Sequence, residues 1–585
     1  MKPMKIKKEP NEIWREYQRG VSYNQNINLY ETVEKNNNFY HGKQWEGLKA
    51  PKLIKPVYNF IKEAVNLYRA TLASDRIGFD IRTVNPVNPP TEENIANGVI
   101  TDDKIPQILE DAVNEVFEGA NLRFLNREAI GNCAVDGDTC MYFYFDPDED
   151  TGFDYKGKIK AEVIDNTNVL FGNPSDKTVE VQPYIIIAYR RLVCDVKDEA
   201  EENGLPTDII QADDETLYMN TNFDSDNRYV TVLLKLWKEK GTVHLKKVTK
   251  NAVIKQEVDT ELKKYPLCYM SWEPIKNSYH GVSAITAQIP NQIYVNKMLA
   301  MVMEYTQKMA FPKILFDQSK IKSEAITNEI GKAIGVVGNP QEAFFTSFQG
   351  ADMSSQVMQV VEFTISKTKE HMGAYDAALG NVNPDNTSAI IATQQAAAAP
   401  LDIQRMTFYN FVESYIRIII DFMRINYGRR WVHIDDVPVE FDFSQLGKYV
   451  YNLNIEIGKS NYWSEVNQQA TLDSIMQMRL FENPQTAKLY INIIPDELLG
   501  NKKTEMLKEL DKAIEDMQMQ QQAALEQQVQ VEQADQNVSG GNELSSNQID
   551  DTAMAIAELA PDEQAEVLQN LGVTNEDRRR IQNAM

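Results

Sequence analysis

Two stretches of the chain decide the fold. Residues 283–310 read SAITAQIPNQIYVNKMLAMVMEYTQKMA, and residues 354–380 read SSQVMQVVEFTISKTKEHMGAYDAALG. Isoleucine recurs every four residues from Ile285 to Ile293, a spacing that places apolar side chains on one face of a helix. The two stretches therefore predict two long helices on either side of a compact insert.

Each helix carries its own boundary signals. Ser283 is a residue type that caps helix N-termini, and Phe311-Pro312 ends the first helix. Pro290 either kinks this helix or marks the start of its longer half. The second helix is predicted over 354–379, with Gly380 as its C-terminal stop.

The insert between the two helices is short and mixed. Residues 313–316 predict a strand, 321–333 a helix and 334–337 a second strand, before a turn at Gly338-Asn339-Pro340.

A loop rich in turn-forming residues follows the second helix. It reads Asn381-Val382-Asn383-Pro384-Asp385-Asn386. A third helix is predicted over 387–427, and Pro400 within it kinks the helix or breaks it in two.

The flanking regions mix helices and strands, so the predicted fold class is α+β and mainly helical. N-terminal to the two helices, the pattern predicts helices at 57–72 and 105–134, a hairpin at 139–145 and 155–164, and a β-meander at 228–237, 241–247 and 252–258. C-terminal to them, it predicts strands at 437–443 and 449–457 and polar helices at 504–533 and 550–570.

Composition limits what such a chain can do. Lys+Arg number 60 and Asp+Glu 85, and the resulting net charge of -25 repels phosphates over most of the surface. A tight grip on DNA is therefore not expected, whereas DNA can slide past such a surface. From residue 501 onward, 17 acidic residues face 7 basic ones, which indicates a solvent-facing tail. The most apolar predicted helix, 411–425, carries four charged residues, so no membrane crossing is expected.

The cysteines fit neither a disulfide framework nor a metal site by their spacing. We expect all of them to be reduced core residues of a protein made in a cytosol. They are Cys133, Cys140, Cys194 and Cys268.

No motif predicts catalysis or cofactor binding. Gly458-Lys459-Ser460 would need a glycine at position 453 to make a P-loop, and Leu453 stands there. The acidic turn Asp146-Pro147-Asp148-Glu149-Asp150 has Thr151 and Gly157 where a calcium loop requires glycine and glutamate. The five histidines show no ligand spacing. We expect no catalytic residue, no cofactor and no metal site, which disfavours a nuclease or a terminase.

Three short motifs and the order of elements resemble bacteriophage portal proteins. Residues 39–45 (FYHGKQW) look like the entry motif of that family, and 56–61 (PVYNFI) like the helix start that follows it. Residues 386–390 (NTSAI), leading into 394–399 (QQAAAA), resemble the exit from the family's tunnel loop. The resemblance extends over about residues 30–500, and its strength comes from the order of the motifs.

The resemblance implies a portal fold with wing, stem, clip and crown regions around an axial channel. It implies a wing region at 1–282, a first stem helix at 283–309, a clip at 310–350, a second stem helix at 351–379, a tunnel loop at 380–386, a kinked wing helix and wing strands at 387–494, and a crown with an acidic tail at 495–585.

The same resemblance implies a structural function. A ring of about twelve subunits would form the channel at one capsid vertex. Through it the terminase motor would package double-stranded DNA, which is later ejected. The implied partners are further copies of the chain, the terminase large subunit, major capsid and scaffolding proteins, and head–tail connector proteins. The implied location is the virion, after assembly in the host cytoplasm. Another virion ring protein, such as a head–tail adaptor, stays the alternative.

Two groups of residues are candidate sites. The polar loop 381–386 offers short contacts without a fixed positive charge, which suits sequence-independent sliding of DNA, although it is otherwise only a helix connection. The second group consists of six lysines, the basic candidates. They either steady DNA or contact the terminase motor, or else they form solvated faces and ion pairs between subunits. They are Lys297, Lys308, Lys313, Lys320, Lys322 and Lys332.

Overall fold

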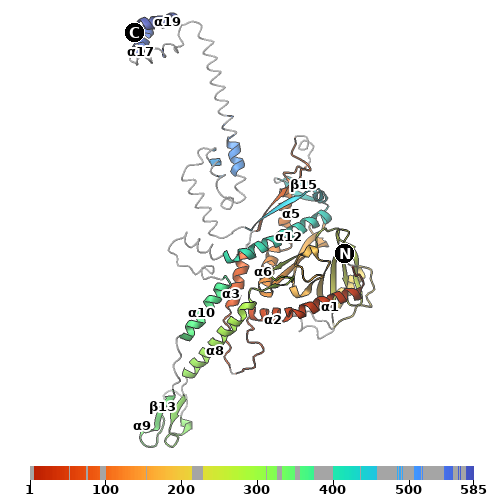
Figure 1. The fold of residues 1–585 in the computed structure, drawn as a ribbon, viewed down its shortest axis with the longest axis vertical. Coiled ribbons are helices and arrows are strands. Elements are labelled where there is room, and N and C mark those ends of the chain that lie inside the picture. The colour runs from red at the N-terminus through yellow and green to blue at the C-terminus, as the bar shows by residue number, and fades with distance from the viewer. Residues whose placement is uncertain are drawn as a thin grey trace. The chain divides into compact units, whose positions relative to one another are not determined.

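The computed structural model of the chain contains two compact units, Met1–Ser460 and Asn461–Met585. In the first unit it describes residues 6–51, 53–73, 77–91, 100–152, 155–213, 228–310, 313–325, 333–348, 356–373, 399–434 and 437–457. In the second unit it describes residues 484, 487–488, 491, 506–514, 517, 519, 546–557, 564, 567 and 575–584. Helices and strands are mixed in the first unit, which confirms the α+β class (Figure 1).

Buried residues of the N-terminal helices belong to the main hydrophobic core and to a second, smaller cluster. They are α1 (Pro10–Asn26), α2 (Leu29–Tyr40), α3 (Phe60–Leu72), α5 (Ile105–Gly119) and α6 (Leu122–Asp136). The helix predicted at 57–72 begins at Phe60, because the Asn59 side chain accepts a hydrogen bond from the backbone N–H of Lys62 at 3.2 Å. The helical stretch predicted over 105–134 is present, but it is divided into two helices. Asn121 adopts a left-handed conformation with φ 52°, which separates α5 from α6.

Two antiparallel sheets confirm the predicted hairpin and meander. The three-stranded sheet has the order β3 (Lys156–Ile164), β2 (Asp138–Asp150), β9 (Leu267–Ser271). The five-stranded sheet has the order β4 (Val169–Phe171), β5 (Tyr184–Leu192), β6 (Tyr229–Glu239), β7 (Thr242–Val248), β8 (Val253–Asp259). In the acidic hairpin turn, Lys160 Nζ lies 2.9 Å from Asp146 Oδ2 and 2.6 Å from Glu149 Oε2. A lysine ammonium therefore pairs with two of the turn's carboxylates.

Strand β6 is covered on both faces, as its long apolar run requires. Leu233 and Trp237 pack with α1 on one face, whereas Val230 and Val232 pack with α7 (Val193–Glu202) on the other. The alternation follows from the two-residue period of a strand. Lys235 points to the α1 face, where it is buried in an ion pair with Glu16.

The predicted pair of long helices is present. The 3-10 turn Thr286–Gln288 leads into α8 (Ile289–Ala310), and α10 (Gln356–His371) lies beside α8 (Figure 1). Pro290 is therefore in the first turn of α8, where its missing N–H costs no hydrogen bond.

The insert between α8 and α10 differs from its prediction in part. Strand β12 (Lys313–Phe316) is confirmed, but its antiparallel partner is β13 (Phe344–Phe348), which follows the short helix α9 (Pro340–Ala343). Residues 334–337, predicted as a strand, form no regular structure, and Val337 is 76% exposed. Of the helix predicted at 321–333, the described part contains the 3-10 turn Ser323–Ala325.

Helix α10 ends earlier than the sequence predicted. Gly373 has φ +70°, a conformation that favours glycine and terminates helices, and its N–H bonds to Glu370 O at 2.9 Å. The helix therefore ends at His371, within the predicted span 354–379. Residues 374–398 lie outside the described part of the chain.

Helix α12 (Asp402–Asn426) runs through the main core of the first unit. Phe408, Tyr415 and Ile419 on this helix are fully buried. Strand β14 (Arg429–Ile434), which was not predicted, pairs with β15 (Val437–Asp442). The strands predicted at 437–443 and 449–457 are confirmed as β15 and β16 (Tyr451–Ile457), and β16 pairs with β1 (Ile77–Thr83). A strand far along the chain, β16, thus pairs with a strand of the N-terminal region.

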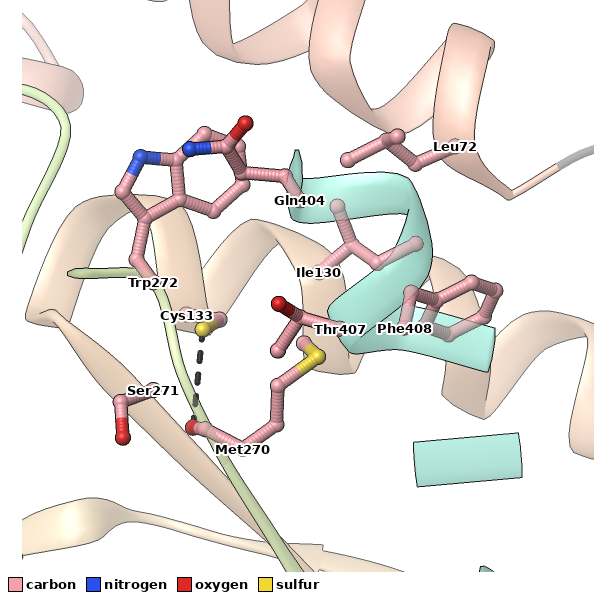
Figure 2. A pocket seen from close by; sticks show the side chains of 9 residues that line it. All are labelled: Leu72, Ile130, Cys133, Met270, Ser271, Trp272, Gln404, Thr407 and Phe408. Atoms are coloured by element: carbon pink, nitrogen blue, oxygen red, sulfur yellow. Dashed lines mark hydrogen bonds between the residues drawn. The ribbon is translucent and has the colours of Figure 1, made fainter. Parts of the chain in front are cut away.

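The cysteines follow the prediction with one exception. Cys133, Cys140 and Cys268 are buried thiols, whereas Cys194 is exposed because it lies in the first turn of the surface helix α7. Figure 2 shows Cys133 below the start of α12, where its Sγ donates to Met270 O at 3.6 Å. Burial raises the pKa of the Cys133 thiol well above its ordinary value, so the thiol stays protonated.

The described part of the second unit is helical. Residues 506–514 form a helix within the predicted 504–533, and α17 (Ser546–Ala557) begins four residues before the predicted start at Asp550. Helix α19 (Asn575–Ala584) packs against α17. A small core of Ile549, Ala553, Ile556 and Ile581 joins the two helices.

Candidate functional site: the paired helices α8 and α10

Helix α8 is anchored by a buried polar network at its N-terminal end. Asn36, on α2, is fully buried. Its Nδ2 lies 2.8 Å from Val135 O, 3.1 Å from Ser283 Oγ and 2.9 Å from Thr286 Oγ1. Ser283 Oγ also accepts from the N–H of Thr286 at 3.0 Å, so the predicted cap holds the turn that precedes α8. We call Asn36, Val135, Ser283 and Thr286 the anchor network.

The backbone beside the anchor network is packed too tightly for any side chain. A Cβ on Gly281 would lie 2.7 Å from Gly137 O, 2.8 Å from Ser271 Cβ and 2.9 Å from Glu273 O. Gly137 has φ +102°, so this position also needs glycine for its conformation. The segment that leads into α8 is therefore held against the end of α6.

Amide side chains tie α8 to the loop that precedes α3. Gln292 Nε2 donates to Tyr58 O at 2.6 Å, and Asn296 Oδ1 accepts from the Tyr58 N–H at 3.2 Å. Both amides are buried, at 0% and 2% exposure. The resemblance motif at 56–61 thus contributes backbone groups that position α8.

Helix α10 is fastened both to α8 and to α3. Asn291 Nδ2 donates to the buried Thr368 Oγ1 at 3.1 Å, which links the two helices. Lys369 Nζ lies 2.8 Å from Glu63 Oε2 on α3, and Tyr68 OH donates to Met372 O. The two helices are thereby fixed at the end where α10 meets the body of the unit.

Farther along, the two helices expose large apolar side chains. On α8, Met301 is 61% exposed, and on α10, Phe363 is 63% exposed. A helix that leaves such residues in water has a face without a partner. We call this set the exposed apolar residues: Tyr294, Met301, Met303, Met358, Val360 and Phe363.

The insert is stabilised by a local turn. Asp317 Oδ1 accepts from Ser319 N–H at 3.0 Å and from Ser319 Oγ at 2.6 Å. These bonds to Ser319, with the nearby Lys320 ammonium, lower the pKa of the Asp317 carboxyl below its ordinary value. The Val337 N–H donates to Lys320 O at 3.1 Å, and this hydrogen bond links the segment around Val337 to the turn.

The basic candidates do not form one cluster in the described structure. Lys297 and Lys322 are exposed, Lys308 pairs with Glu304 on the same helix at 2.9 Å, and Lys320 lies 4.0 Å from Asp317. Lys313 lies in β12, and Lys332 lies outside the described residues.

The loop candidates also fall outside the described part of the chain. They are Asn381, Val382, Asn383, Pro384, Asp385 and Asn386. Pro400 is described and exposed. It lies in the 3-10 turn Ala399–Leu401 that directly precedes α12.

A second buried polar cluster near the anchor network was not found by sequence reasoning. His280 Nδ1 lies 2.9 Å from Asp138 Oδ2, and its Nε2 lies 3.1 Å from Asn24 Oδ1.

The nearby Asp136 has an unusual carboxyl group. Burial and the neighbouring Asp165 raise the pKa of this carboxyl to about 8. The only local signal was the run of acidic residues around Gly137, which does not reveal what faces it.

The comparisons with known proteins identify the family. The family model described as "Phage P22-like portal protein" matches residues 189–569, which include both long helices and the insert between them. A comparison with curated proteins gives no match.

The chain therefore belongs to the phage P22-like portal protein family, as its sequence resemblance implied. This is a family of structural proteins, not of enzymes. In the described parts of both units, no helix combines the length and apolar character that a membrane span requires.

Proposed function

We propose that this chain is the subunit of a ring of about twelve copies that forms the DNA channel at one capsid vertex. The terminase motor packages the genome through this channel, and the genome later leaves by the same path. The ring is also the docking platform for terminase and then for head–tail connector proteins. It assembles with capsid and scaffolding proteins in the host cytoplasm and becomes part of the virion.

The observation that carries this proposal is the pair α8 and α10 with its exposed apolar residues. One end of the pair is fixed by buried hydrogen bonds, whereas Met301 and Phe363 remain more than half exposed. Complete burial of a wholly exposed side chain of this size contributes about 1.5–3 kcal/mol, so covering these partly buried residues contributes a large part of that amount. Neighbouring copies in a closed ring would cover these residues in every subunit.

The regional assignment follows from this proposal. Helices α8 and α10 form the stem, the β12–β13 insert the clip, and residues 380–386 the tunnel loop. Residues 1–282 and 387–494 form the wing, and 495–585 form the crown.

The acidic composition fits a channel that does not retain DNA. With a net charge of -25 per chain, few counterions are released when DNA enters, so little affinity opposes its movement. Asn381, Asn383 and Asn386 then contact DNA without a fixed charge. A map of the DNA-filled channel in which the 380–386 loops stand clear of DNA would refute this contact.

The test of the ring is direct. The purified full-length chain should give annular particles of about twelve subunits in negative-stain electron microscopy, with a matching mass in light scattering. Monomers or open filaments at micromolar concentration would overturn the proposal. Rings that bind the isolated terminase large subunit would support the packaging role, and rings that bind only tail proteins would indicate a head–tail adaptor instead.

The basic candidates are tested in the same rings. Lys297 and Lys322 are exposed, so Lys297→Glu and Lys322→Glu change charge without breaking a described ion pair. A loss of terminase binding or of packaged DNA would assign them a contact role. Unchanged binding and packaging would leave them as solvated surface residues.

A further inference from the structure

Three adjacent strands of the five-stranded sheet bring together a histidine and two glutamates. Glu239 is the last residue of β6, His244 lies in β7, and Glu257 lies in β8. One ligand atom from each of the three side chains lies within 4.8 Å of the others. The sequence showed no ligand spacing here, because the three residues meet only when the strands pair.

The imidazole of His244 is held in a fixed orientation. Its ring stacks on Trp237 with the centroids 5.8 Å apart. Nε2 lies 3.5 Å from Thr242 Oγ1, which can accept its proton, whereas Asp259 Oδ2, at 3.8 Å, lies beyond hydrogen-bond distance. Histidines that bind metals commonly donate one ring N–H to an oxygen, which leaves the other nitrogen as the ligand. Here Thr242 Oγ1 is that oxygen, and it donates in turn to Asp259 Oδ2 at 3.1 Å.

The other ring nitrogen faces the two glutamates. His244 Nδ1 is shielded from solvent and makes no hydrogen bond, although Glu257 Oε1 lies only 3.1 Å away. A buried nitrogen that lacks a hydrogen-bond partner calls for an explanation, and a cation bound by both the imidazole and the carboxylate would supply one.

A cation already occupies this position in the described structure. The Lys8 ammonium lies 3.0 Å from Glu239 Oε2 and 2.7 Å from Glu257 Oε1, above the Trp237 ring at 5.3 Å. The Lys8 side chain is 36% exposed, so its contribution to stability is small and it can swing into solvent.

The backbone around Lys8 is held independently of its ammonium group. Lys235 Nζ donates to Lys7 O at 2.8 Å, and Lys246 Nζ donates to Lys8 O at 2.8 Å. The side chain can therefore leave the glutamates while the segment stays on the sheet.

We propose that Glu239, His244 and Glu257 form a binding site for a divalent transition-metal ion, which enters in exchange for the Lys8 ammonium. One imidazole nitrogen and two carboxylate oxygens suit Zn²⁺ or Mn²⁺, with water as a further ligand. The glutamates are 39% and 32% exposed, which leaves them free to rotate toward the ion. The site lies entirely on the sheet and does not depend on ring formation.

The test uses the full-length, untagged chain after treatment with a chelator. Zn²⁺ is titrated by calorimetry, and Co²⁺ is titrated by its visible absorption, which reports a nitrogen and oxygen ligand field. We expect one ion per chain, at least about tenfold tighter binding by Lys8→Gln, and loss of binding by Glu257→Gln. Asp259→Asn, which removes a carboxylate behind the imidazole, should weaken binding about 10- to 100-fold.

Matched variants keep the result interpretable. Glu180→Gln removes a carboxylate that pairs with Lys238 near the same sheet but lies outside the cluster, so it should bind the ion as the wild type does. His244→Gln is made in the Lys8→Gln background, with the circular dichroism melt as the check on folding.

Three results would overturn the proposal. They are no ion bound by Lys8→Gln at millimolar metal, unchanged binding after His244→Gln in that background, or equal losses from Glu180→Gln and Glu257→Gln. If His244→Gln fails to fold, the comparison of the wild type with Lys8→Gln decides alone.

Discussion

The two ends of helix α8 differ in their surroundings: one is buried and the other is exposed. At the N-terminal end, Asn36 and Ser283 belong to a network whose polar groups are buried and paired within the chain. Toward the C-terminal end, Met301 and Met303 are 61% and 43% exposed. The same helix therefore begins inside a buried core of its own chain and continues as an exposed apolar surface.

This contrast separates stability from assembly. Removing a buried hydrogen-bonding group leaves its partners unsatisfied, so changes at the N-terminal end should unfold the chain. Changes in an exposed side chain cost little in the monomer, so those near the other end should act on association between copies. The substitutions below test that division, in order of decreasing effect on stability.

The largest effect is expected from Asn36→Ala. It leaves Val135 O, Ser283 Oγ and Thr286 Oγ1 without the amide donor they share, at a cost of about 3 kcal/mol in the free energy of unfolding. Denaturant unfolding followed by tryptophan fluorescence measures the change. The matched control is Asn38→Ala, in the same helix but only half-buried, which should change stability by less than about 0.5 kcal/mol. Equal losses from the two variants would contradict the role of the network.

A somewhat smaller loss is expected from Gly281→Ala. The new Cβ would meet Gly137 O at 2.7 Å, which forces the backbone apart and costs about 2 kcal/mol. Gly335→Ala is the control, because a Cβ there meets nothing within 4 Å. The difference in thermal midpoint between the two variants measures the effect, and a midpoint for Gly281→Ala at or above that of the control would exclude a tight contact.

A pH dependence is expected from Asp136, which accepts a hydrogen bond from Asn37 Nδ2 at 2.6 Å. Its folded-state pKa of about 8 lies above the ordinary 3.8, so the folded chain retains a proton that the unfolded chain has lost. This stabilisation is complete below 3.8 and is lost as the pH rises toward 8, by about 1 kcal/mol per pH unit. Asp136→Asn should flatten that slope in unfolding experiments across the window. Asp103→Asn, at an exposed aspartate, should leave the slope unchanged.

The smallest effect on stability, and the largest on assembly, is expected from Phe363→Lys. The side chain is 63% exposed, so the monomer should lose no more than about 0.5 kcal/mol. A lysine at a covered interface must be desolvated, so rings should be replaced by monomers in mass photometry. Lys367→Ala, one turn along the same helix, is the control that should still form rings. Rings formed by Phe363→Lys with wild-type mass would show that this residue lies outside the subunit contact.

Much of the local structure could be predicted from the sequence. The hairpin and meander were predictable because their strands are neighbours in the chain and alternate in polarity, and α8 because isoleucines recur every four residues. The failures have specific causes. Asn121 and Gly373 end helices through their left-handed conformations, and β13 forms only because it lies opposite β12.

The sequence by itself determined the class of fold, the pair of long helices with its insert, and the resemblance to portal proteins, because these depend on periodicity, turn chemistry and the order of motifs. Only the tertiary structure decided which distant residues meet. It paired β1 with β16, placed Asn36 against Ser283, and brought His244 to Glu239 and Glu257. Such contacts depend on how sheets and helices pack, and no local pattern in the chain encodes the partner on the other side.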